Sequence, residues 1–277
     1  MLRSKLQPPT MSQPADLARS RQFVRSARLP APPPQPRSGG EADTVDEALQ
    51  AGKAQAAVVG SELVSFATGV APQWRQDLIN CSLFAQLWAK AEVADPTRIF
   101  DWYGAYFGAL QQLGWMVQDQ GFAVYVETSQ NFSAHQAILK VAEGLLMPAA
   151  GSLALVKTTL DALASMDSGS PFLTLFSRES QQASAARFQI SLAEQTADGG
   201  LSVALMAFGL EATTTLTQVL FFKSLASQAT LRHCSGKVSI DTALLEALRP
   251  DLSEQLKEHA RSFIRKLPGK LLQRPAA

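Results

Sequence analysis

The stretch from Arg187 to Ile240 decides the fold, and it reads RFQISLAEQTADGGLSVALMAFGLEATTTLTQVLFFKSLASQATLRHCSGKVSI. Four apolar, β-branched or aromatic runs alternate there with turn signals: Phe188–Ala193, Leu201–Leu210, Leu216–Phe222 and Leu231–Ile240. Such runs favour strands. The links between them are short, and a parallel crossover needs about a dozen residues or more, so we expect consecutive antiparallel strands.

Alternation along these runs predicts which sides of the sheet are apolar. In the first run Phe188, Ile190 and Leu192 point one way, whereas Gln189 and Ser191 point the other, which indicates one solvent-facing side. The second and third runs are apolar on both sides and are expected to be central strands, with Phe221 and Phe222 buried. The apolar sides require a cover of helices.

Helical periodicity and capping signals supply that cover. Helices are expected over residues 46–59, 72–88, 95–113, 133–147, 152–163, 172–180 and 245–267. Residues 61–70 fit a helix or a strand equally well, and 115–117 and 122–126 are short strand candidates. The sequence therefore predicts an α+β fold, an antiparallel sheet of about four to five strands packed against several helices.

The 277 residues divide into three parts by composition. Residues 1–45 are basic and rich in proline, cannot bury enough apolar surface to fold alone, and are expected to be a disordered tail. A single α+β globular domain is expected over 46–268 and a second disordered tail over 269–277. The basic tail could also be an organelle transit peptide or a docking segment for a proline-recognising domain. Because it has no apolar run like that of a Sec signal, we expect a cytoplasmic protein or one exported by another route.

Composition and missing motifs exclude several functions. The net charge of +1 favours neither nucleic acid nor a membrane surface, and no run of about 18 apolar residues predicts a membrane span. Phosphate-loop, dinucleotide, zinc and serine-hydrolase motifs are absent. We expect no catalytic residues, no metal and no cofactor. His233 and Cys234 are adjacent in a predicted strand, so their side chains point to opposite sides and make a poor catalytic pair.

The two cysteines, Cys81 and Cys234, are the candidate sites of unusual chemistry. Two cysteines do not make a disulfide framework, and both fit buried thiols in a reducing compartment. Cys81 lies on a helical stripe with Trp74 and Trp88, whereas Cys234 follows Arg232 and His233 in a more polar, edge-like setting. If a lipid is attached, Cys81 is expected to be the less accessible thiol and the anchor. The alternative is that Cys81 simply fills core volume.

Several strings resemble a family of largely uncharacterised bacterial and fungal proteins over residues 46 to 267. They are VVGSELVSF (58–66), LINCSLFAQL (78–87), Trp102-Tyr103, Leu113-Gly114-Trp115 and TQVLFFK (217–223). The chain is also similar to the Erwinia virulence factor, an α/β protein acylated on a cysteine buried in a tunnel. That resemblance implies a role in virulence and a bound fatty acyl group. It assigns no residue of this chain.

These observations together predict a non-catalytic binding or effector-type module. Its partner would be a hydrophobic or acyl ligand or another protein, because the core is rich in apolar residues and lacks a catalytic motif. Two alternatives stay open: an enzyme with an unrecognised site, using Cys81 or Cys234, and a membrane-surface protein that binds through its final helix or its basic tail.

Overall fold

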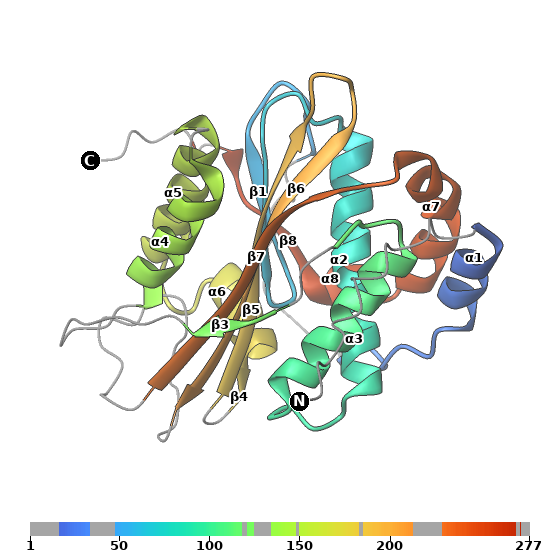
Figure 1. The fold of residues 1–277 in the computed structure, drawn as a ribbon, viewed down its shortest axis with the longest axis horizontal. Helices are drawn as coiled ribbons and strands as arrows, with labels where there is room; N and C mark the ends of the chain where they lie inside the picture. The colour runs from blue at the N-terminus through green and yellow to red at the C-terminus, as the bar shows by residue number, and fades with distance from the viewer. Residues whose placement is uncertain are drawn as a thin grey trace, which may run out of the picture.

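The computed structural model describes residues 17–33, 48–117, 121–124, 134–147, 150–182, 185–212, 229–269 and 272. A central sheet is enclosed between two layers of helices (Figure 1). The α+β class predicted from the sequence is confirmed. The sheet is larger than the four to five strands expected and is not purely antiparallel.

Eight strands form the sheet within the described residues. They are β1 (Gln55–Val59), β2 (Glu62–Phe66), β3 (Ala123–Val124), β4 (Gln181–Gln182), β5 (Ala185–Gln195), β6 (Leu201–Ala212), β7 (Ala229–Ser239) and β8 (Ile264–Lys266). Their order is β3-β7-β6-β5-β2-β1-β8, and β4 pairs with β5. All pairings are antiparallel except that of β2 with β5. The parallel pair joins the N-terminal hairpin to the strands predicted from the 187–240 stretch.

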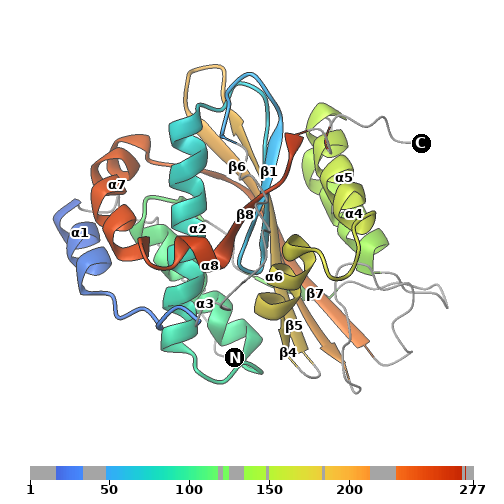
Figure 2. The ribbon, with the colours of Figure 1, turned by 180° about the vertical axis from the view of Figure 1, so that it is seen from behind.

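Helices cover both faces of this sheet (Figures 1 and 2). They are α1 (Leu17–Ser26), α2 (Pro72–Glu92), α3 (Ile99–Gln112), α4 (Ala134–Leu146), α5 (Ala150–Ala164), α6 (Pro171–Ser180), α7 (Thr242–Leu256) and α8 (Ala260–Phe263). Helices α2 and α3 lie on one face, with α7 and α1 outside them, and α4, α5 and α6 lie on the other. Each face has its own apolar cluster, so the sheet separates two cores.

The helix expected over residues 46–59 is wrong in its second half, because Gln55–Val59 is strand β1. Gly60, whose φ is +56°, allows the tight turn that brings Val59 opposite Glu62 in a hairpin. The alanines suggested a helix, but Val58 and Val59 suit a strand, and β1 gains partners on both sides, β2 and β8.

The long C-terminal helix expected over residues 245–267 is also wrong in part. Helix α7 ends at Leu256, and Ile264–Lys266 instead forms β8 along the edge of β1. Apolar residues continue at helix-like spacing through Phe263 and Leu267, and this spacing led to the prediction of one long helix. The unpaired backbone groups of β1 provide a tertiary partner that the sequence pattern does not reveal.

The strand predicted at Leu216–Phe222 lies outside the described residues, as do Phe221 and Phe222. The predicted order puts this run between β6 and β7. Strands β6 and β7 pair directly from Ser202 opposite Ser239 to Ala212 opposite Ala229. The consecutive order of four strands is therefore wrong for this run, because the 201–212 and 229–239 segments satisfy each other's hydrogen bonds.

The N-terminal segment differs from the disordered tail expected over residues 1–45, because Leu17–Ser26 is helix α1. Val24 is fully buried, Arg25 Nε donates to Asp251 at 2.8 Å, and the Pro30 carbonyl lies 2.8 Å from His259 Nε2. This segment is too polar to fold alone, but α7 supplies the missing surface. Residues 1–16 and 34–45, and most of 269–277, lie outside the described residues.

Among the helices that the structure describes, none combines the length and the apolar character needed to cross a membrane.

Arg75 connects α2 to the turns that flank the β1–β2 hairpin. Its side chain is fully buried and donates to the carbonyls of Val70 (2.8 Å), Lys53 (2.9 Å) and Ala67 (2.9 Å) and to Gln55 Oε1 (2.8 Å). Burial lowers its pKa to about 10, so the guanidinium stays charged at neutral pH. Among side chains, only the planar guanidinium has enough N–H donors to reach these three carbonyl oxygens and Gln55 Oε1 at once.

Replacing Arg75 with Lys should lower the free energy of unfolding by about 2–3 kcal/mol, since hydrogen bonds from a charged donor are lost and buried oxygens are left unpaired. Urea denaturation measures this change. Arg98→Lys, at a side chain 60% exposed in an ion pair with Asp101, is the matched control and should change it by under about 0.5 kcal/mol. Equal effects would contradict the role given to Arg75.

Candidate functional site

The sheet face under α2 and α3 carries a row of polar side chains. Gln189 and Ser191 were expected to face solvent, but their exposed fractions are 0% and 1%. That expectation is wrong because helices cover this side as well as the other. Their neighbour on β2 is Glu62, opposite Gln189 in the parallel pair and 1% exposed. A buried carboxyl group must find partners within the protein.

Three hydroxyl groups surround the Glu62 carboxyl group. Ser191 Oγ donates to Oε1 at 2.5 Å, and Tyr106 OH donates to Oε2 at 3.0 Å. Ser82 Oγ of α2 also donates to Oε2. Burial raises the pKa of Glu62, and the three hydroxyl donors oppose that rise without cancelling it. The group is satisfied by residues of β5, α2 and α3 together.

The network continues through two glutamines. Gln86 Nε2 donates to Ser82 Oγ at 3.0 Å and to the Val59 carbonyl at 2.9 Å, while its Oε1 accepts from the Ser61 amide at 2.9 Å. Ser61 Oγ lies 3.0 Å from Gln189 Oε1, and Gln189 Nε2 donates to Tyr103 OH at 3.0 Å. This chain of hydrogen bonds fixes α2 and α3 against the sheet.

Chemically, this network is suited to stability rather than to turnover. Glu62, Gln189 and Tyr106 are all enclosed, so a substrate would have to displace packed side chains to reach them. Burial also raises the pKa values of Tyr103 and Tyr106. These two phenol groups therefore stay protonated at neutral pH and act as hydrogen-bond partners and not as bases.

A more accessible feature lies at the other edge of α3, where it meets β7. Two cavities occur there, of about 140 Å³ and about 270 Å³. Phe107 lines both. The smaller is lined also by Val117, Leu205, Cys234, Gly236, Lys237 and Val238, and the larger by Phe100, Tyr103, Gly104, Phe122 and Arg232. Together they form the candidate site, hereafter the α3–β7 cavities.

Glycines leave this space open. A Cβ atom added to Gly104 or to Gly236 would meet no heavy atom within 4 Å. Gly104 lies inside α3, where glycine costs about 1 kcal/mol relative to alanine. Neither glycine belongs to a recognisable sequence motif. In the sequence, Gly104 is a glycine inside a helical pattern and Gly236 a glycine inside a strand pattern, and each such position can mark a close approach or an open space.

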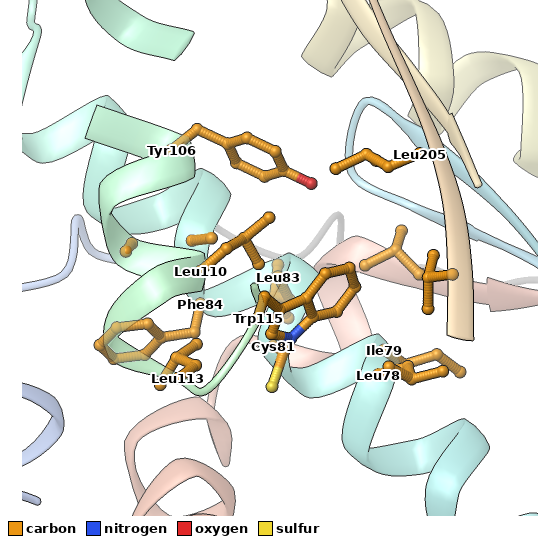
Figure 3. Packing of buried hydrophobic residues seen from close by; sticks show 14 of the residues in the cluster. Leu78, Ile79, Cys81, Leu83, Phe84, Tyr106, Leu110, Leu113, Trp115 and Leu205 are labelled. Atoms are coloured by element: carbon orange, nitrogen blue, oxygen red, sulfur yellow. The ribbon is translucent and has the colours of Figure 1, made fainter. Parts of the chain in front are cut away.

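The two candidate cysteines lie in different surroundings. Cys81 is fully buried, as expected, and burial raises its pKa to about 12. Figure 3 shows it packed among apolar side chains, with its sulfur near the indole nitrogen of Trp115. Cys234 is 7% exposed and belongs to the apolar cluster, so the polar setting expected for it is wrong. Its strand β7 does lie near the edge of the sheet, next to the two-residue strand β3. Cys234 lines the smaller α3–β7 cavity.

Strand alternation separates Cys234 from its neighbour His233, as predicted. Cys234 belongs to the cluster under α2 and α3, whereas the His233 ring lies 6.4 Å from that of Phe208, in the opposite cluster. The structure therefore brings no imidazole of this neighbour to the Cys234 thiol. Cys81 and Cys234 come from different elements and do not form one site.

No family model matches the chain, and no curated protein matches it. Among solved structures, the chain is similar to one titled delta-endotoxin, at 15% sequence identity with a TM-score of 0.30. That similarity covers 75% of this chain and 89% of the other. A similarity of this level supports no argument about function.

Glu62→Gln should change how stability depends on pH. In the unfolded chain the carboxyl group ionises near its ordinary pKa of 4.5, whereas the folded state keeps it protonated to higher pH. Between these values the folded state binds more protons, so the free energy of unfolding of the wild type falls as pH rises above 4.5. Glutamine does not ionise, so the free energy of unfolding of Glu62→Gln should not fall with pH for this reason.

Denaturant unfolding from pH 4 to pH 8 measures this effect. The free energy of unfolding of Glu62→Gln minus that of the wild type should increase with pH from 4.5 upward. Glu211→Gln, at an exposed position on β6, is the control and should give a nearly flat difference. A difference for Glu62→Gln that does not vary with pH would show that burial leaves this carboxyl group unaffected.

Gly104→Ala should raise the free energy of unfolding by about 0.5–1 kcal/mol, because alanine favours the helix and its Cβ enters open space. Thermal or urea unfolding measures the gain. A loss of stability on this substitution would mean that the larger cavity is filled in solution.

Proposed function

We propose that this protein is a non-catalytic binding module that holds a hydrophobic or acyl ligand in the α3–β7 cavities. One observation carries the proposal: the Cys234 thiol opens onto a cavity of about 140 Å³ that shares Phe107 with a second cavity of about 270 Å³. Small-molecule sites usually begin at about 300 Å³. Neither cavity reaches that size alone, and the two together do.

The lining favours an apolar occupant. Four of the seven residues that line the smaller cavity are apolar, namely Phe107, Val117, Leu205 and Val238. Four of the six that line the larger cavity are aromatic. Ligand sites are commonly lined mainly by apolar and aromatic side chains with a few polar groups, as these two cavities are. An apolar chain buried there would gain about 25 cal/mol for each Å² removed from water.

The surroundings of the thiols support binding rather than catalysis. Cys234 has its neighbouring imidazole on the opposite sheet face, and burial keeps Cys81 protonated well above neutral pH. A reactive cysteine needs a lowered pKa or a nearby base. The resemblance to the Erwinia virulence factor suggests an acyl group on a cysteine, and Cys234, rather than Cys81, has the space for one beside it.

The test narrows the smaller cavity without disturbing the fold. Gly236→Val adds a side chain whose Cβ meets no atom within 4 Å, at a strand position that suits valine. Ser239→Val, an exposed position on the same strand, is the matched control. Binding of decanol to each purified protein is measured by native mass spectrometry and by titration calorimetry.

The wild type and Ser239→Val should bind one decanol with equal affinity, and Gly236→Val should bind it at least about tenfold more weakly, since its side chain occupies the ligand's volume. Equal binding by Gly236→Val, or none by the wild type, would refute the proposal. Intact mass before and after hydroxylamine, with Cys234→Ala and Cys81→Ala, distinguishes a covalent acyl group from a dissociable ligand.

A further inference from the structure

One arginine stands at the outer end of the α3–β7 cavities. Arg232 lies on β7 two residues before Cys234 and four before Gly236, so the three share one side of the strand. The distance along the strand from Arg232 to Gly236 is about 13 Å. The Arg232 guanidinium lines the larger cavity and lies 5.3 Å from the centre of the Phe100 ring.

The hydrogen-bonding capacity of Arg232 is not used up within the described structure. Its Nε atom is buried and has no hydrogen-bond partner. The Glu211 carboxylate lies 3.9 Å from that nitrogen, beyond hydrogen-bonding distance, and its side chain is 48% exposed. A guanidinium has five N–H donors and binds a carboxylate or phosphate best with two of them in parallel.

A second arginine adds positive charge next to this position. Arg187 on β5 and Arg232 on β7 are both opposite Gly209 of β6, so they lie in one row across the sheet. Arg187 is 6% exposed, its Nε atom has no partner, and its Nη1 donates to the Pro96 carbonyl at 3.3 Å. Its guanidinium lies 4.5 Å from the centre of the Trp102 ring.

Glu211 is the acidic group that pairs with Arg232 itself, at 3.9 Å, and two further acidic groups are engaged with other cations. Glu179, which acts electrostatically on Arg187, is paired with Lys90 at 3.5 Å and with Arg178 at 2.7 Å. Asp101 of α3 accepts from Arg98 at 2.7 Å. Positive charge therefore exceeds negative charge at this end of the cavities, where aromatic rings keep the local polarity low.

We infer that Arg232 binds the anionic headgroup of a single-chain amphiphile, a fatty carboxylate, whose hydrocarbon chain passes Phe107 into the cavity beside Cys234. This inference rests on the proposed function and specifies its ligand class. Arg187 supports the headgroup through its charge two strands away, on the far side of β6, and is not expected to contact the ligand. A polar head at the partly exposed Arg232 and an apolar tail at the buried Cys234 match the polarity of the cavities from end to end.

The test varies the headgroup while the chain stays the same. Affinities of decanoate, decyl phosphate and decanol are measured by titration calorimetry for the wild type, Arg232→Gln and Arg261→Gln. Arg261 is an exposed arginine on α8, away from the cavities, and serves as the matched control. Unfolding curves for each variant show that it is folded under the conditions of the titration.

The wild type and Arg261→Gln should bind decanoate about tenfold more tightly than decanol, the size expected for a charge-assisted hydrogen bond. Arg232→Gln should lose this preference and bind decanol as the wild type does. Tighter binding of decyl phosphate than of decanoate, also lost in Arg232→Gln, would assign the anion site to a phosphate headgroup in place of a carboxylate.

Two results would overturn the inference. Equal affinities of the wild type for decanol and decanoate would show that Arg232 does not bind an anionic headgroup. The proposed function, binding of an apolar ligand in the cavities, would not be contradicted by that result. A preference for decanoate that persists in Arg232→Gln would place the headgroup elsewhere. Failure of the wild type to bind any of the three compounds would refute the proposed function itself, and the inference with it.

Discussion

The structure depends on the covering of both faces of strands β5 and β6. Phe188, Ile190 and Leu192 point into one core, while Gln189, Ser191 and Ala193 point into the other. Polar side chains on a covered face must be hydrogen-bonded, or their burial destabilises the protein. The partners are Glu62 from β2, Ser61 from the hairpin turn and Tyr103 from α3. The parallel pairing of β2 with β5 places these groups together.

Helix α3 has two roles as a result. Tyr103 and Tyr106 extend from it into the polar network, and Phe107 packs beside them. Gly104, one residue after Tyr103, leaves open the side of the helix that faces the larger cavity. The network holds α3 at a fixed distance from the sheet, so the space beside it cannot close by movement of the helix alone. Binding at a cavity whose walls are already fixed would cost little conformational entropy.

The same constraint separates the two cysteines. Cys81 lies where α2 packs under Trp115 and α7, and its surroundings are filled (Figure 3). Cys234 lies where β7 lines the smaller α3–β7 cavity together with Gly236. Its position next to an apolar space, with Arg232 at the far end, follows from strand alternation alone once β7 pairs with β6. The difference between the thiols is therefore one of packing and not of local sequence.

Local sequence determined much of this protein. The runs at 188–193, 201–210 and 231–240 were found as strands, and α2 to α6 were expected close to their observed positions, because alternation and helical spacing act over a few residues. Cys81 was correctly placed in the core for the same reason. Only the tertiary structure decided that Gln55–Val59 and Ile264–Lys266 are strands, since each requires a partner distant in the sequence. The burial of Gln189 and the meeting of Phe107, Arg232 and Cys234 also arise from contacts between separate elements, which no local pattern encodes.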